Sequence, residues 1–233
     1  MKTIAIIPAR GGSVGIPKKA LVDLCGKPLI AWSIEQALQS ERVDEVWVTS
    51  DSEEILDVAR QYNTITIKRP DELATDKSTI EDALKHALVC MGYKNDDNIV
   101  LLQPTSPLRK HNDIDAIIEG FEIGNLDSEF SSIFAEDSFI WKFVDFELKS
   151  INYNYENRKT RQDFEIQFIE NGSIYIFKPN ILFKYNNRLG GKIGTYVMDK
   201  WQVFEIDDRE DLELCEYYMR KYMNDKFEMT KFI

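Results

Sequence analysis

The sequence has few of the residues that build histidine or cysteine sites. Among its 233 residues only His86 and His111 are histidines, and the three cysteines stand alone at positions 25, 90 and 215. No C-x-x-C spacing joins the cysteines, so the sequence supports neither a disulfide framework nor a zinc site. Two histidines are also too few for a histidine-based metal site or triad. These absences favour a reduced, cytoplasmic protein.

Long apolar runs and an excess of positive charge are missing as well. No stretch approaches the roughly 18 apolar residues of a membrane span, and the run before Arg10 is too short for a signal peptide. The 29 lysines and arginines are outnumbered by 40 aspartates and glutamates, which gives a formal net charge of −11. Because surfaces that bind nucleic acid are normally basic, the sequence predicts a protein that binds neither nucleic acid nor membrane.

The first apolar run of the chain leads into a glycine-rich loop. The β-branched segment Thr3–Pro8 predicts a buried parallel strand, and residues 9–19 read ARGGSVGIPKK. Three glycines let main-chain N–H groups approach an anion, while Arg10, Lys18 and Lys19 add positive charge around it. The loop matches neither the dinucleotide fingerprint nor the Walker A motif. The loop predicts a site that binds the phosphates of an anionic small molecule. The alternative is a glycine-rich turn with solvated lysines.

Strand and helix patterns alternate along the chain. Apolar runs predict strands at residues 3–8, 45–50, 64–68, 98–102, 130–135 and 193–198. Amphipathic patterns predict helices after Pro28, after Ser52, over 112–123 and over 209–223, and a capping box at Ser78-Thr79-Ile80-Glu81 predicts one more. This alternation predicts an α/β fold with a mostly parallel sheet.

A polar segment follows the strand at 98–102. Ligands of open parallel sheets bind beyond the carboxyl ends of the strands, where Gln103-Pro104-Thr105-Ser106-Pro107 emerges. Two prolines restrict the loop, so the Gln103 amide and the Thr105 and Ser106 hydroxyls are held in place. We expect these groups to contact a base or a ribose. The alternative is a tight turn whose hydroxyls cap the helix from Asn112.

Two acidic side chains lie two residues apart near the end of the chain. In Val203-Phe204-Glu205-Ile206-Asp207-Asp208, a strand would place Glu205 and Asp207 on one face. Like charges so close favour a bridging cation, and hard oxygen ligands with spare positions suit a Mg²⁺ ion shared with substrate phosphates. The alternative is an acidic strand end without a metal.

Aromatic residues gather in a segment without periodicity, residues 137–165. Exposed aromatics on a protruding segment are more typical of an interface than of a cofactor site. Arg161, which follows the aromatic residues, offers a planar fork that can bind a carboxylate with two hydrogen bonds. Asn171 and the glycine after it form either a ligand site or a turn into a strand.

Together these segments resemble the acylneuraminate cytidylyltransferases, the CMP-sialic acid synthetases, which are sugar-nucleotide nucleotidyltransferases. The resemblance extends from Thr3 to about Asp211. Its motifs are Arg-Gly-Gly-Ser-x-Gly-Ile-Pro-x-Lys at 10–19, Arg-Pro-x-Glu-Leu-Ala-x-Asp at 69–76, Leu-Leu-Gln-Pro-Thr-Ser-Pro-Leu-Arg at 101–109, Arg-Gln at 161–162, Asn-Gly-Ser-Ile-Tyr-Ile at 171–176 and acid-x-Asp at 205–207.

The resemblance implies a Rossmann-like, mostly parallel sheet of the nucleotidyltransferase type. It implies a single domain over 1–233, with residues 137–165 inserted as the dimerisation lobe of a cytoplasmic homodimer. The implied reaction transfers CMP from CTP to the anomeric hydroxyl of a nonulosonic, sialic-acid-like sugar acid and releases pyrophosphate, with Mg²⁺, for cell-surface polysaccharide biosynthesis.

The resemblance also assigns site residues, with Arg10 and Lys19 as the catalytic pair. The nucleotide-binding residues are Ala9, Arg10, Gly11, Gly12, Ser13, Lys19, Ser78, Gln103, Thr105 and Ser106. The sugar-binding residues are Gln103, Lys142, Arg161, Gln162 and Asn171, and the metal ligands are Glu205 and Asp207.

Three positions depart from the family pattern. Val14 stands where many members have lysine, Ala20 replaces the usual asparagine, and Ile169 lies where some members have arginine. Ile169 favours a sugar less polar than sialic acid or differently substituted, such as a legionaminic-type acid. The alternatives are activation of another sugar acid such as Kdo, use of a different nucleotide, or a nucleotide-binding relative that has lost catalysis.

Overall fold

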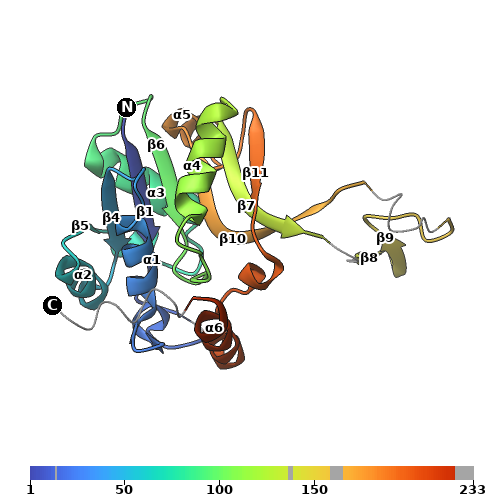
Figure 1. Cartoon of the computed structure of the whole chain (residues 1–233), viewed down its shortest axis with the longest axis horizontal. Coiled ribbons are helices and arrows are strands. Elements are labelled where there is room, and N and C mark those ends of the chain that lie inside the picture. The colour runs from blue at the N-terminus through green and yellow to red at the C-terminus, as the bar shows by residue number, and fades with distance from the viewer. Residues whose placement is uncertain (14, 136–138, 158–164, 224–233) are drawn as a thin grey trace.

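A seven-stranded sheet runs through the centre of the protein (Figure 1). The computed structural model describes residues 1–13, 15–135, 139–157 and 165–223. Across the sheet the strands follow the order β11 (Ile193–Val197), β7 (Ser128–Phe134), β10 (Phe168–Phe177), β6 (Asn98–Leu102), β1 (Thr3–Pro8), β4 (Glu45–Ser50) and β5 (Ile65–Lys68). The six strands predicted from apolar runs are present, and β1, β4 and β6 have the predicted bounds.

The sheet is mostly parallel, as predicted. β1 pairs in parallel with β4 and β6, β4 with β5, and β11 with β7. Only β10 runs antiparallel to its neighbours β6 and β7. All five residues of β6 are buried, which explains why its sequence is a continuous apolar run rather than an alternating one.

Helices cover both faces of this sheet. Within the described residues they are α1 (Leu29–Leu38), α2 (Glu53–Gln61), α3 (Ile80–Met91), α4 (Asp113–Ile123), α5 (Pro179–Tyr185) and α6 (Arg209–Tyr222). Because side chains alternate along a strand, Ala5 and Ile7 of β1 pack with α1, α2 and α4, whereas Ile4 and Ile6 pack with α3 and α5. α6 buries Cys215 in a third cluster beside α1.

The capping box of α3 lies one residue later than predicted. Thr79, not Ser78, is the N-cap: its side chain accepts a hydrogen bond from the Asp82 N–H, and the Asp82 carboxylate accepts one from the Thr79 N–H. Ser78 instead donates its hydroxyl to the Glu72 carbonyl and accepts from the Thr75 N–H. Both residue pairs have the three-residue spacing of a capping box, so the sequence alone could not choose between them.

An antiparallel hairpin stands apart from the body of the protein at the end of β7 and β10 (Figure 1). It consists of β8 (Trp141–Val144) and β9 (Glu147–Ser150), which both fall in the segment predicted to form a lobe. Residues 136–138 and 158–164 lie outside the described residues. A short two-stranded sheet, β2 (Asp23–Leu24) with β3 (Lys27–Pro28), precedes α1.

Candidate active site

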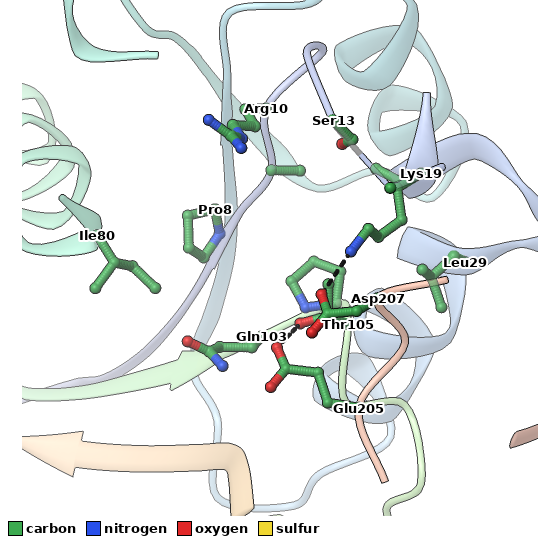
Figure 2. Close-up of a pocket in the computed structure, with 14 residues that line it drawn as sticks. Pro8, Arg10, Ser13, Lys19, Leu29, Ile80, Gln103, Thr105, Glu205 and Asp207 are labelled. Carbon is green, nitrogen blue, oxygen red and sulfur yellow. Dashed lines mark hydrogen bonds and ion pairs between the residues drawn. The ribbon is translucent and has the colours of Figure 1, made fainter. Parts of the chain in front are cut away.

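A cavity of about 460 Å³ opens at the carboxyl ends of β1 and β6. This is the edge at which ligands of open parallel sheets bind. In Figure 2, Arg10 and Ser13 lie across the cavity from Gln103 and Glu205. The remaining lining residues are Pro8, Ala9, Gly15, Lys19, Ala20, Leu29, Ile80, Pro104, Thr105 and Asp207. The structure therefore brings together three segments that the sequence analysis had singled out separately.

Two of the three expected cations belong to this site. The Lys19 Nζ atom lies 2.8 Å from Asp207 Oδ1 and 2.9 Å from the Ile206 carbonyl. Arg10 Nη1 lies 2.8 Å from Asp76 Oδ1. Lys18, however, has left-handed backbone geometry and pairs with Glu54 of α2, so it lines neither cavity described here. The prediction that Lys18 surrounds the anion with the other two cations is wrong.

The glycine loop does not leave all its main-chain donors free. The Gly11 N–H donates to Asp51 Oδ1 at 3.0 Å, so this amide already has a partner within the protein. Around Gly12 no heavy atom lies within 4 Å of the position a Cβ would take, which leaves this part of the loop open. Ser13 lines the cavity, and Val14, the departure from the family pattern, lies outside the described residues. Ala20 is buried at the cavity wall.

The loop after β6 contributes side chains from fixed positions. Thr105 Oγ1 donates to Glu205 Oε1 at 2.7 Å, and the Thr105 carbonyl accepts from the Ile206 N–H at 2.8 Å. Ser106 is only 1% exposed, and its Oγ has no hydrogen-bond partner among the described residues. The alternative that these hydroxyls cap α4 is wrong for Thr105, because its hydroxyl donates to the Glu205 carboxylate instead.

Arg109 organises this loop from within the core, a role that the sequence analysis missed. It is fully buried, and its Nη2 donates to the carbonyls of Gln103 at 2.7 Å and Ser173 at 2.8 Å. Its Nη1 donates to Ser33 Oγ and Gln36 Oε1. Burial lowers the pKa of the Arg109 guanidinium to about 9. The only sequence signal was that Arg109 is the one charged residue of the motif at 101–109.

The two predicted metal ligands line the cavity, but they are not on a strand. Glu205 and Asp207 belong to an irregular segment between the 3-10 helix Lys200–Val203 and α6. The expected alternation survives, because both carboxylates are exposed while Ile206 between them is fully buried. The capping box of Asp208 and Asp211 at the start of α6 fixes the end of the segment.

The glycine loop and the acidic segment touch directly. A Cβ at Gly15 would lie 2.1 Å from the Asp207 carbonyl oxygen, so only glycine fits this contact without a shift. Lys19 makes the second connection, through the Ile206 carbonyl. The glycine loop is therefore joined to the acidic segment at Ile206 and Asp207.

A second cavity of about 290 Å³ adjoins the first and shares Pro8, Ala9, Arg10 and Ile80 with it. Ser78 lines this smaller cavity, together with Arg69. Arg69 is 5% exposed, its Nη2 donates to the Ala9 carbonyl at 3.0 Å, and its Nε has no partner among the described residues. Burial lowers the pKa of Arg69. Arg69 had no predicted role, although it is the first residue of the motif at 69–76.

The predicted sugar-binding residues are only partly gathered at the site. Gln103 lines the larger cavity. Asn171 is buried, and its amide contacts Ser131 Oγ, Met198 Sδ and the Gln202 carbonyl rather than the cavity. Lys142 is exposed on β8, in the hairpin that stands apart from the body. Arg161 and Gln162 lie outside the described residues.

The fold is that of solved nucleotidyltransferases. CMP:2-keto-3-deoxy-manno-octonic acid synthetase, solved in complex with CTP, superposes with a TM-score of 0.71 at 20% identity, over 95% of this chain and 99% of that one. A 4-diphosphocytidyl-2C-methyl-D-erythritol synthase superposes with a TM-score of 0.66 at 13% identity, over 94% of this chain and 99% of the other. These similarities show the shared α/β architecture.

Within that class, the chain belongs to the cytidylyltransferase family, whose model matches residues 4–225. It is 34% identical to an N-acylneuraminate cytidylyltransferase of Escherichia coli O18:K1:H7 over 98% of this chain and 54% of that protein. It is 31% identical to a pseudaminic acid cytidylyltransferase of Campylobacter jejuni over 93% of this chain and 95% of that one. The chain spans about half the length of the N-acylneuraminate cytidylyltransferases it matches. The resemblance inferred from the motifs is confirmed.

Proposed function

We propose that this protein transfers CMP from CTP to the anomeric hydroxyl of a nonulosonic sugar acid and releases pyrophosphate. One observation carries the proposal: the cations Arg10 and Lys19 share a single cavity with the carboxylates of Glu205 and Asp207. A triphosphate needs the first pair, and a metal that accompanies it needs the second. The relatives named for N-acylneuraminate and pseudaminic acid support an acid of this type as acceptor.

The charges of the site match those that the reaction develops. Attack of the sugar hydroxyl on the α-phosphorus increases negative charge on the phosphate oxygens and on the leaving pyrophosphate. Arg10 and Lys19 neutralise this charge in a site that is already arranged to receive it. Both cations now pair with carboxylates, Asp76 and Asp207, so triphosphate binding exchanges one anionic partner for another.

The Glu205 and Asp207 carboxylates fit Mg²⁺. They supply hard oxygen donors, and no group of three or more potential ligands gathers in the part of the chain that the structure describes. Such a pair suits an ion that takes its other ligands from phosphates and water. When bound, Mg²⁺ would polarise the α-phosphate and assist deprotonation of the nucleophile. Thr105 and Lys19 orient the two carboxylates toward the cavity.

The smaller cavity suits the nucleoside end of CTP. Arg10 borders both cavities and therefore sits between a base and its phosphates. Cytosine carries hydrogen-bond acceptors, and the buried Nε of Arg69 is a donor without a partner among the described residues. Ser78 adds a hydroxyl to the same cavity. The sugar acid then occupies the side of the larger cavity bordered by Gln103 and Glu205. Arg161 and Gln162 stay predicted contributors to its binding, whereas the buried Asn171 amide is bonded within the core.

We propose that the protein works as a homodimer through the hairpin of β8 and β9. Phe143 is 69% exposed and Phe146 is 93% exposed, and Leu148 lies beside them. Exposed apolar patches of this kind mark interaction surfaces. Lys142, which alternates with Trp141 and Phe143 on β8, would then reach the site of a second copy.

A cytoplasmic location stays a prediction, supported by three free cysteines. Among the described residues, no helix has both the length and the apolar character needed to cross a bilayer.

The decisive experiment measures pyrophosphate release for each of CTP, UTP, ATP and GTP with each of several sugar acids. The acids are N-acetylneuraminic, pseudaminic, legionaminic and 2-keto-3-deoxy-manno-octonic acid. Release with CTP and a nonulosonic acid is the expected result. Release with 2-keto-3-deoxy-manno-octonic acid alone would reassign the acceptor. Binding of CTP by calorimetry without release from any acid would identify a nucleotide-binding relative that lacks catalysis.

A further inference from the structure

β10 passes the cavity with a glycine, Gly172, in a left-handed conformation with φ of +69°. The register between β10 and β7 shifts between Glu170 and Tyr175, so the strand is irregular at this point. A residue with a side chain is strained in this backbone region. The left-handed backbone is by itself a sufficient reason for glycine at position 172. It gives no information on whether the residue also shapes the cavity.

The surroundings of Gly172 give it a second role. A Cβ at this position would lie 3.0 Å from Gln103 Nε2, 3.5 Å from Ser106 Oγ and 3.6 Å from Glu205 Oε2. Polar groups from two distant segments thus converge on the bare face of one glycine. The 3.0 Å contact is tighter than ordinary van der Waals contact, so any side chain would displace the Gln103 amide.

The main chain around Gly172 cannot easily move away instead. Asn171 and Ser173 on either side are buried, and Asn171 Oδ1 accepts hydrogen bonds from Ser131 Oγ at 2.6 Å and from the Ser173 N–H at 3.2 Å. Arg109 holds the Ser173 carbonyl and the Gln103 carbonyl to one guanidinium nitrogen. The Gln103 side chain is the mobile partner, because the part of the chain described here offers its amide no hydrogen bond.

We propose that Gly172 is a positioning residue: its missing side chain lets the Gln103 amide lie against β10 and so sets the shape of the acceptor side of the cavity. The inference rests on the proposed function, which assigns that side to the sugar acid. A methyl group at position 172 would push the Gln103 amide toward the substrate and leave Arg10 and Lys19 in place.

Gly92 provides a matched control. It also has a left-handed conformation, with φ of +66°, but no heavy atom lies within 4 Å of its Cβ position. Gly172→Ala and Gly92→Ala therefore carry the same kind of backbone strain, and only the first adds a contact. A misplacement of 1 Å at a reacting site can cost about a hundredfold, so a shift of a few tenths of an ångström should cost roughly tenfold or less. We expect Gly172→Ala to raise the KM for the sugar acid by about that factor, with the KM for CTP unchanged, and Gly92→Ala to change neither.

The double mutant with Gln103→Ala separates positioning from strain. Without the Gln103 amide, Gly172→Ala has nothing to displace, so it should add no further increase in KM for the sugar acid. Urea unfolding of the wild type, the three single variants and both double variants with Gln103→Ala tests the same contact. The extra destabilisation of Gly172→Ala over Gly92→Ala should disappear in the Gln103→Ala background.

Equal effects of Gly172→Ala and Gly92→Ala on both KM and stability would overturn the inference, as would a full Gly172→Ala effect in the absence of Gln103. If the wild-type protein releases pyrophosphate with none of the four sugar acids, the proposed function fails. The unfolding measurements then test the inference by themselves. Energetic coupling between positions 172 and 103 would support the contact of Gly172 with the Gln103 amide, and the absence of coupling would refute it.

Discussion

Replacing Lys19 with methionine tests the phosphate site, because the neighbouring lysine supplies its own control. Lys19 is 12% exposed and points into the cavity, where it pairs with Asp207. Lys18 is 64% exposed and pairs with Glu54 outside both cavities. Lys18→Met and Lys19→Met remove the same charge from adjacent residues, so they differ only in where the ammonium group lies.

The expected magnitudes follow from these positions. A charge-assisted hydrogen bond to a phosphate contributes about 1.5–3 kcal/mol, which is roughly tenfold to a hundredfold in affinity. Lys19→Met should weaken CTP binding by that factor and lower kcat as well, because the negative charge grows in the transition state. Its effect on stability should be small, since Asp207 is 76% exposed and remains hydrated when its partner is lost. Lys18→Met should change CTP binding by less than about twofold.

Isothermal titration calorimetry gives the CTP affinities, pyrophosphate release gives kcat, and urea unfolding shows that both variants fold. The reasoning is refuted if Lys18→Met weakens CTP binding as much as Lys19→Met. It is also refuted if Lys19→Met binds CTP like the wild type.

Three further predictions concern the metal, the hairpin and a buried acid. Asp207→Asn should abolish turnover and leave the fold intact, and full activity of the wild type in excess EDTA would contradict the metal assignment. Light scattering should show a dimer at micromolar concentration, and Phe143→Ser with Leu148→Ser should yield monomers; a monomeric wild type would contradict the interface. Burial raises the pKa of Glu129 to about 7, so the unfolded state ionises first and stability falls as pH rises from about 4.5 to 7. In Glu129→Gln the free energy of unfolding should fall less steeply with pH over this range, by up to roughly 1.4 kcal/mol per pH unit. Unfolding at several pH values measures this slope.

The strands of the body were predictable because each is a short, continuous apolar run. β1, β4 and β6 have the bounds expected from the apolar runs in the sequence. The direction of β10 was not predictable, since an apolar run carries no information on which way its strand runs. Its antiparallel course appears only once the partners β6 and β7 are known.

The candidate site was predictable at the level of segments and less so at the level of side chains. Glu205 and Asp207 alternate with buried Ile206 as expected, although no strand carries them. Lys18 and Lys19 carry the same charge, and the resembling motif already singled out Lys19; the left-handed backbone at Lys18 explains why only Lys19 reaches the cavity. Arg109 could not be recognised, because its partners are main-chain carbonyls of distant residues, and carbonyls leave no mark in a sequence.

The contact of Gly15 with Asp207 joins residues from opposite ends of the chain. Lys19 and Asp207 are 188 positions apart. At the usual speed of synthesis, the glycine loop waits roughly 10 to 40 s on the ribosome before its acidic partner is made. The emerging chain can form the strands β1, β4 and β6 during that time, but not the complete site. Early folding intermediates should therefore contain the first strands of the sheet without the assembled site.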